Sequence, residues 1–305
     1  MSSSPVSADA TASPVVSAYP TIVAFRAALD EARAAGKTVG FVPTMGYLHD
    51  GHASLMRAAA ATCDLVAASI FVNPLQFAPT EDLSSYPRNL ERDTEIAAEA
   101  GVTLLFTPTV DEMYPFGPVL TTVSVAEVSA PWEGATRPTH FAGVATVVAK
   151  LFSIVGPCRA FFGEKDFQQL AVIRRMVADL SIPVDVVGCP IVREPDGLAM
   201  SSRNTYLEGA ERDAAIVLRR ALDAGIAAIT DGARDPAAVM ATMTDVVAAE
   251  PLATLDYVAA VDAATLQVPA LLEGEVRLLV AAQVGRPRLI DNAGVTIDTD
   301  GTVAV

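Results

Sequence analysis

Short apolar runs alternate with longer segments of helical spacing from about Thr21 to Val192. The runs are nearly all apolar and rich in β-branched residues, which is typical of strands buried on both faces of a parallel sheet. Alternating strands and helices predict a Rossmann-like, doubly wound α/β domain. The expected strands are 38–43, 65–72, 102–106, 159–163 and 184–188, and the expected helices are 52–62, 90–100, 141–155 and 167–180.

The pattern changes after Val192. Two alanine-rich helices and three strand-like runs predict a second, smaller α+β domain, joined through R-E-P-D-G-L at 193–198, which has turn chemistry. The predicted division is a disordered extension at 1–20, a nucleotide-binding domain at 21–191 and a lid domain at 192–305. Within the lid, the helices are expected at 209–230 and 235–250, and the strands at 255–261, 276–284 and 288–290.

Composition limits the possible functions. The chain has 305 residues and an apolar fraction of 51%, which excludes a mainly disordered protein. Its net charge of −15 disfavours broad attraction to nucleic acid or anionic membranes, so any anion site must be local. The three cysteines lack C-x-x-C spacing and are expected to be reduced. With neither a signal peptide nor a membrane span recognisable, a cytoplasmic protein is predicted.

Two of the three histidines stand in P-T-M-G-Y-L-H-D-G-H at 43–52, between an expected strand and helix. Imidazole N–H groups and a helix N-terminus both suit phosphate, and His49 and His52 share a side if the helix begins just after His49. A P-loop is disfavoured because His52 and Ala53 replace its Lys and Ser/Thr. A zinc site would need further ligands, and His140 lies in a separate segment, R-P-T-H-F.

A second polar cluster follows another expected strand, in F-F-G-E-K-D-F-Q-Q at 161–169. Only three of the 21 basic residues are lysines, and Lys165 can act there as a mobile charge for a phosphate. Asp166 is expected to cap the next helix. The amides of Gln168 and Gln169 suit a hydroxy acid.

A third cluster, M-S-S-R-N at 200–204, sets two hydroxyls beside an arginine and forms a small anion clamp. Each cluster also has an ordinary structural explanation: satisfied histidines in a turn, a solvated turn with a helix cap, and a serine-rich turn. The combination of the three favours a shared phosphate site.

This combination resembles a known family. H-D-G-H with a later M-S-S-R-N is similar to the H-x-G-H and K-M-S-K-S pair of adenylate-forming nucleotidyltransferases. More narrowly, the chain resembles the pantoate–β-alanine ligases over about 21–292. Six motifs in order carry the resemblance: V-P-T-M-G-Y-L-H-D-G-H, S-I-F-V-N-P-L-Q-F, E-D-L-S-S-Y-P-R, R-P-T-H-F-A-G-V, F-F-G-E-K-D-F-Q-Q-L and D-G-L-A-M-S-S-R-N.

The resemblance implies a two-step ligation that uses ATP and Mg²⁺. The pantoate carboxylate attacks the α-phosphorus and gives pantoyl adenylate and pyrophosphate. The amine of β-alanine then attacks the adenylate, which releases pantothenate and AMP. A homodimer is also implied, and no covalent enzyme intermediate.

The resemblance also implies roles for individual positions. His49, His52, Lys165 and Arg203 match catalytic residues, with His52 at the position usually assigned as proton donor. The positions implied for ATP binding are Met45, His49, His52, Gly163, Glu164, Lys165, Asp166, Val192, Met200, Ser201, Ser202 and Arg203. Those implied for pantoate and β-alanine are Gln76, Gln169, Asn73 and Arg137.

The chain departs from the family pattern at two places. Tyr47 stands where a small residue is usual, and Glu91-Arg92-Asp93 replaces a run of adjacent acidic residues near the metal. The protein ligands of Mg²⁺ are therefore left open. The lid is expected to close over the nucleotide about the 193–198 linker.

Other function classes make different predictions. A nucleotidyltransferase acting on a phosphate ester would not require Gln76 and Gln169, and a non-catalytic nucleotide-binding module would have no turnover to lose. A class I aminoacyl-tRNA synthetase is disfavoured because the chain is acidic and lacks an anticodon-binding region.

Overall fold

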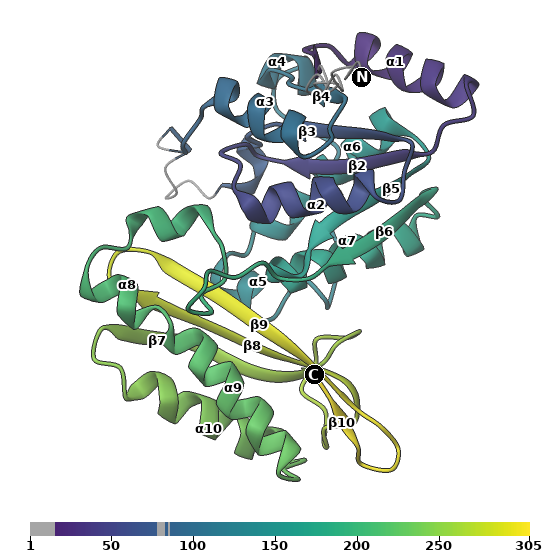
Figure 1. Ribbon diagram of the computed structural model, residues 1–305. Helices are drawn as coiled ribbons and strands as arrows, with labels where there is room; N and C mark the ends of the chain where they lie inside the picture. The colour runs from purple at the N-terminus through teal and green to yellow at the C-terminus, as the bar shows by residue number, and fades with distance from the viewer. Residues whose placement is uncertain (1–15, 78–82, 85) are drawn as a thin grey trace, which may run out of the picture.

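The computed structural model describes residues 16–77, 83–84 and 86–305, which form two sheets (Figure 1). The larger sheet has six parallel strands in the order β1-β4-β3-β2-β5-β6. It confirms the expected Rossmann-like α/β class. Its strands are β1 (Ser17–Tyr19), β2 (Val39–Thr44), β3 (Leu65–Ile70), β4 (Leu104–Phe106), β5 (Cys158–Gly163) and β6 (Val184–Cys189).

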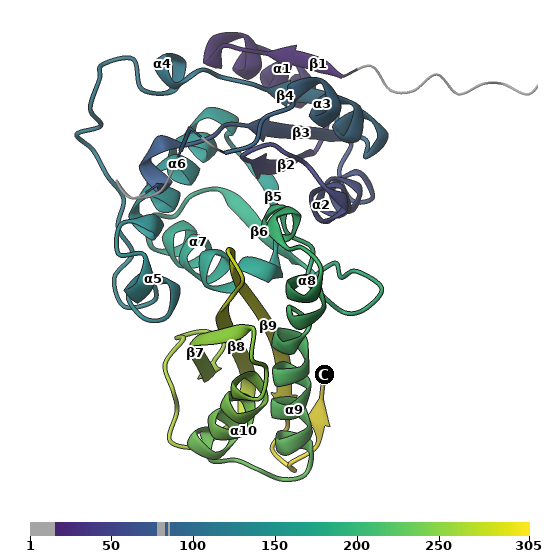
Figure 2. The ribbon, with the colours of Figure 1, turned by 90° about the vertical axis from the view of Figure 1, so that its left-hand side faces the viewer.

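Helices cover both faces of the larger sheet (Figure 2). Neighbouring residues of β2 show why: Phe41 belongs to one buried cluster and Val42 to another, because successive strand residues point to opposite faces. The Phe41 cluster includes α1 (Ile22–Ala34), α6 (His140–Val155) and α7 (Phe167–Asp179). The Val42 cluster includes α2 (Asp50–Ala60) and α3 (Leu90–Glu99).

The strand order reverses between β2 and β5, since β3 and β4 follow β2 on one side while β5 and β6 lie on the other. Ligands of open parallel sheets bind beyond the carboxyl ends of the strands at such a switch point. The motifs at 43–52 and 161–169 follow β2 and β5, so the fold brings them together there.

The smaller sheet is antiparallel, in the order β10-β9-β8-β7, with α9 and α10 packed on one face (Figures 1 and 2). This arrangement confirms the expected second α+β part. Its elements are α8 (Ala210–Ala214), α9 (Val217–Thr230), α10 (Pro236–Ala248), β7 (Ala253–Asp262), β8 (Gly274–Val284), β9 (Arg288–Ile297) and β10 (Val303–Ala304). The short elements between β3 and α7 are η1 (Pro74–Gln76), α4 (Val110–Met113), α5 (Glu133–Thr136) and η2 (Glu164–Asp166), and η3 (Ser202–Tyr206) precedes α8.

Three sequence expectations need correction. The predicted disorder at 1–20 is wrong for Ser17–Tyr19, which pair with β4, while residues 1–15 of that prediction lie outside the described residues. The helix expected at 209–230 is interrupted between α8 and α9. The strand expected at 288–290 runs on to Ile297, because the polar Asp291 and Asn292 are buried with partners rather than ending it.

The described residues include no helix of sufficient length and apolarity to cross a membrane. Cys63, Cys158 and Cys189 are free thiols, as expected from their spacing. Burial raises the pKa of the Cys158 thiol to about 12, which leaves it protonated at neutral pH.

Candidate active site

A cavity of about 460 Å³ lies beyond the carboxyl ends of β2, β5 and β6, at the switch point of the sheet. Residues from all three clusters seen in the sequence line it. The residues expected at the site that line it are Met45, His49, His52, Gln76, Arg137, Gly163, Lys165, Asp166, Gln169, Val192, Met200, Ser201, Ser202 and Arg203. Of the positions that the resemblance implies for ATP, pantoate and β-alanine, Asn73 and Glu164 do not line it.

The two histidines of 43–52 form the start of α2. His49 is the N-cap, and its Nδ1 accepts the Gly51 N–H at 3.1 Å. The Nδ1 of His52 accepts the His49 N–H at 3.4 Å, which completes a reciprocal capping box. Since both Nδ1 atoms are acceptors, each neutral ring carries its proton on Nε2. The rings lie close together, with centroids 4.2 Å apart.

Both imidazoles are uncharged at neutral pH. Burial, with a further contribution from His49, lowers the pKa of His52 to about 3. Burial and then the charge of Lys165 lower the pKa of His49. The pair therefore provides two neutral N–H donors, which suits a hydrogen bond to phosphate better than proton donation by an imidazolium.

Asp93 holds the loop that leads to these histidines. Its side chain is buried and accepts the N–H groups of Tyr47 and Leu48, both at 2.7 Å. Gly46 and Tyr47 have positive φ angles of 82° and 51°, a conformation that the paired carboxylate stabilises. Arg92 donates to the Leu48 carbonyl at 2.9 Å, and its guanidinium lies 5.7 Å from the centroid of the Tyr47 ring. Tyr47 and Arg92, where the chain departs from the family pattern, thus contact each other.

Lys165 projects from the turn η2 that follows β5, and its Nζ lies 3.6 Å from Oδ1 of Asp166. Asp166 is at the N-cap of α7 but makes no capping hydrogen bond, so that part of its prediction is wrong. Burial raises the pKa of its carboxyl, but the charges of Lys165 and Arg203 outweigh burial and leave the pKa below its usual value. Asp166 is therefore an ionised carboxylate beside two cations.

Two residues of the second motif face away from the cavity. The Glu164 carboxylate pairs with Arg277 at 3.0 Å. Gln168 is buried, donates to the carbonyls of Val128 and Pro131, and accepts the Glu133 N–H. Its amide holds the chain before α5, so the predicted role of Gln168 toward a hydroxy acid is wrong. Gln169 lines the cavity.

Gln76 is positioned by a buried amide network. Asn73 donates from Nδ2 to Oε1 of Gln76 at 3.1 Å and to the Gly143 carbonyl at 3.2 Å, and it accepts the Tyr114 hydroxyl at 2.8 Å. Asn73 is fully buried behind Gln76 instead of lining the cavity. A Cβ on Gly143 would lie 2.0 Å from the Leu75 carbonyl oxygen, so α6 can approach η1 only at a glycine.

The third histidine also reaches the cavity. His140 begins α6, lines the cavity, and its Nδ1 lies 3.1 Å from the Gln76 carbonyl oxygen. Arg137 donates to the same oxygen at 3.3 Å. In the sequence His140 stands in a separate segment, and the density of polar residues in R-P-T-H-F is the signal that could assign it to the site. Part of another motif, E-D-L-S-S-Y-P-R, lies outside the described residues.

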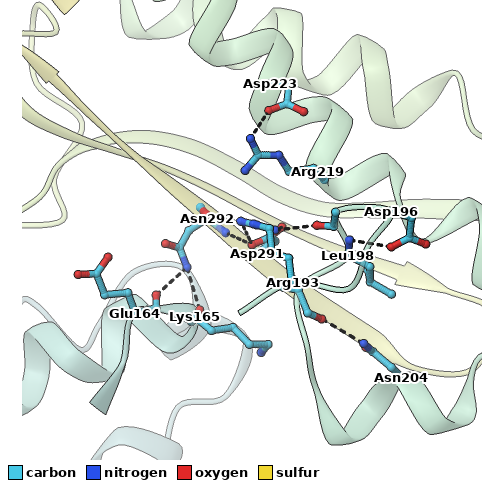
Figure 3. A network of polar contacts seen from close by, with 12 residues as sticks. Glu164, Lys165, Arg193, Asp196, Leu198, Asn204, Arg219, Asp223, Asp291 and Asn292 are labelled. Carbon is cyan, nitrogen blue, oxygen red and sulfur yellow. Dashed lines mark hydrogen bonds and ion pairs between the residues drawn. The ribbon is translucent and has the colours of Figure 1, made fainter. Parts of the chain in front are cut away.

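The linker that carries the third cluster is a bonded turn. Arg193 pairs with Ala199 in a β-bridge, and the Met200 N–H donates to the Val192 carbonyl at 3.0 Å. The Arg193 guanidinium makes two bonds to the buried Asp291 of β9, at 2.7 and 3.1 Å (Figure 3). These contacts fix the base of the loop that holds Ser201, Ser202 and Arg203 against the cavity.

Among the described residues, no group of three or more His, Cys, Asp or Glu side chains could hold a metal ion. Asp166 is the one carboxylate lining the cavity in the part of the chain that is described. Asp93 uses both oxygens on backbone N–H groups. The donor set therefore fits a magnesium ion bound mainly by substrate phosphates, with one carboxylate nearby.

Known proteins are similar to this chain in sequence and in fold. The sequence model of the Pantoate-beta-alanine ligase family matches residues 17–294. The chain is 54% identical over 262 residues to the pantothenate synthetase of Heliobacterium modesticaldum, covering 86% of this chain and 93% of that protein. The corresponding figures for the Geobacter sulfurreducens enzyme are 52% identity over 262 residues, 86% and 92%.

Solved structures agree. The crystal structure of pantothenate synthetase from Thermus thermophilus matches with a TM-score of 0.85 and 50% identity, covering 90% of this chain and 98% of that one. Pantoate-β-alanine ligase from Francisella tularensis, complexed with β-γ ATP and β-alanine, matches with a TM-score of 0.75 and 33% identity, covering 92% and 97%. The family model covers most of the chain, the relatives are about half identical to it, and its strand-end motifs line one cavity. The chain therefore belongs to the pantoate-β-alanine ligase family.

Proposed function

We propose that this cavity performs the reaction of the family, the ATP-dependent ligation of pantoate and β-alanine to pantothenate, a precursor of coenzyme A. One observation carries the proposal: all but two of the positions that the resemblance implies for ATP, pantoate and β-alanine line a single cavity at the switch point. The chain is an AMP-forming ligase that makes an amide bond.

In the first step, an oxygen of the pantoate carboxylate bonds to the α-phosphorus of ATP, and the bond to pyrophosphate breaks. Charge accumulates on phosphate oxygens, so fixed donors and cations matter more than proton transfer. His49 and His52 donate from Nε2, while Lys165 and Arg203 supply positive charge on a strongly acidic chain. Ser201 and Ser202 add hydroxyl donors.

In the second step, the amine of β-alanine attacks the acyl carbon of pantoyl adenylate and AMP leaves. The amides of Gln76 and Gln169 hold the pantoate hydroxyl and carboxylate groups, and Asn73 acts from behind by orienting Gln76. Arg137 provides charge for a substrate carboxylate. Met45, Gly163, Val192 and Met200 form the wall against the nucleoside.

The remaining proposals concern surroundings and assembly. Asp166, the carboxylate that lines the cavity, would hold magnesium together with the phosphates of ATP, and the ion would supply charge neutralisation there. The enzyme works in the cytoplasm, which suits its free thiols and its ATP requirement. It forms a homodimer, as the resemblance implies. The part at 192–305 acts as a lid on the part at 21–191, and its closure excludes water from the adenylate.

The decisive experiment mixes the protein with Mg·ATP, pantoate and β-alanine and omits each component in turn. AMP and pantothenate are expected only in the complete mixture, and pyrophosphate is expected whenever ATP and pantoate are both present. Pyrophosphate release that does not depend on pantoate would contradict the proposal and favour a nucleotidyltransferase. ATP binding without any turnover would indicate a non-catalytic module.

A further inference from the structure

The Lys165 turn is held by a residue of the smaller sheet. Asn292 lies on β9 and is only 3% exposed. Its Nδ2 donates to the carbonyl oxygens of Glu164, at 3.0 Å, and Lys165, at 2.8 Å (Figure 3). One side-chain amide thus binds two consecutive carbonyls of the turn from which Lys165 enters the cavity.

Asn292 is itself fixed in orientation. Its Oδ1 accepts the Nε–H of Arg277 at 2.7 Å, so the Nδ2 group must face the carbonyls. Arg277 stacks 4.0 Å from the ring centroid of Phe167 and pairs with the Glu164 carboxylate. The side chain of Asn292 therefore has little rotational freedom, and so do the carbonyls that it holds.

The same stretch of β9 holds the base of the serine–arginine loop. Asp291 makes the two bonds to Arg193, and Arg193 also donates to the Asn292 carbonyl at 3.3 Å. Two adjacent residues of β9 therefore fix two segments that carry cations of the cavity. One segment is the turn of Lys165, and the other is the linker leading to Arg203.

We propose that Asn292 is a positioning residue, which aims Lys165 at the phosphates of ATP by holding the backbone of its turn. The proposal depends on the proposed function. The Lys165 side chain is long and flexible. Among the described residues, its only ion-pair partner is the neighbouring Asp166, whose Oδ1 lies 3.6 Å from the Lys165 Nζ. Its direction therefore depends on the backbone, and small misplacements of a reacting group can lower a rate by about 100-fold.

The test replaces Asn292 with leucine, which has a similar size, no charge and no donor. Pantoate-dependent pyrophosphate release should fall by about 100-fold. The dissociation constant of Mg·ATP should rise about tenfold, while that of adenosine, which has no phosphate, should not change. A merely structural role would instead weaken adenosine and ATP to the same extent.

Gln283→Leu is the matched control. Gln283, on β8, also donates from Nε2 to two backbone carbonyls, those of Gly285 at 3.0 Å and Arg286 at 2.5 Å in the turn between β8 and β9, but its side chain is exposed. Its rate and its affinity for ATP should equal those of the unaltered protein. Should Asn292→Leu fail to fold, Asn292→Ser keeps one donor and should show an intermediate loss of the rate and of ATP affinity.

A double-mutant cycle with Lys165→Ala isolates the connection. The cycle is measured by the dissociation constant of ATP, so it requires no catalytic turnover. If Asn292 acts through Lys165, Asn292→Leu will change the ATP affinity little once the lysine is gone. An equal factor in both backgrounds, or unchanged ATP affinity in the single variant, would overturn the inference. Failure of the proposed function is distinguishable, because the unaltered protein would then release no pantoate-dependent pyrophosphate.

Discussion

The loop of His49 and His52 takes its supports from the large domain, whereas the turn of Lys165 takes a main support from the small one. Asp93 of α3 holds the first by two backbone N–H groups, and Asn292 of β9 holds the second by two carbonyls. The histidine donors are therefore organised whatever the small domain does. The turn of Lys165 is held in place only while β9 packs against it. The contact between the two domains therefore controls the position of this cation in the site.

Removing a histidine donor should have the largest effect. We expect His52→Ala to slow pantoate-dependent pyrophosphate release by more than about 100-fold, since a fixed donor to the developing charge is lost. His52→Gln keeps a neutral donor near Nε2 and should recover much of that rate. If His52→Gln is as slow as His52→Ala, the neutral-donor role is wrong and a charged imidazolium is required.

Removing the lysine should rank next, at about 100-fold in the same assay. Lys165→Ala takes away one of the few local cations but leaves the backbone grip of Asn292 intact, so the thermal midpoint should hardly move. Lys37→Ala, an exposed lysine outside the cavity, is the control. A collapsed fold in circular dichroism of Lys165→Ala would make the residue structural.

The support within the large domain should be weaker in its effect on rate. Asp93→Asn keeps the size of the side chain but turns an N–H donor toward the N–H of Tyr47 or Leu48, which costs about 1–3 kcal/mol of unfolding free energy. The rate of pyrophosphate release should fall about tenfold. In the double variant, the losses of rate from Asp93→Asn and Asn292→Leu should multiply, because the two residues hold different motifs. Asp30→Asn, on the exposed face of α1, is the control. A double variant whose rate departs strongly from the product of the two single effects would show that the histidine loop and the Lys165 turn are not held independently.

The neutral state of the histidines predicts a pH dependence of stability. Burial lowers the pKa of His52 from 6.5 to about 3, so the unfolded chain binds the proton more readily. The unfolding free energy should therefore fall as the pH drops below about 6.5, by about 1.4 kcal/mol per unit for this group. Denaturant unfolding of His52→Asn should show a shallower dependence between pH 6.5 and about 4.5. Identical slopes would refute the buried neutral ring.

The smallest effect on the rate is expected when the contact between Arg92 and the Tyr47 ring is removed. Arg92→Ala removes one hydrogen bond and the contact with the Tyr47 ring, and should lower the unfolding free energy by about 0.5–1 kcal/mol with little change in rate. Glu91→Ala, its neighbour on α3, is the control. A large loss of rate would mean that Arg92 and not Asp93 holds the loop.

The sequence was most informative where function and local structure coincide. Strand-end motifs such as H-D-G-H predicted both a helix start and a phosphate site, because capping and anion binding use the same free N–H groups. Long-range polar contacts were not predictable. Asn292 lies 127 positions after Lys165 along the chain, and Gln168 lies 40 positions after the Val128 carbonyl that its amide binds. No local pattern distinguishes such amides from those that face a substrate.

The contact of β9 with the Lys165 turn also bears on the order of assembly. The six-stranded sheet of β1 to β6 can form before β9 has left the ribosome, but the two turn carbonyls then lack their partner. Contacts across so many positions form late in folding, since loop-closure entropy opposes them. During synthesis or refolding, burial of the sheet should therefore precede the competence to bind triphosphate, and the last long strand to be made completes the site begun by the first motif.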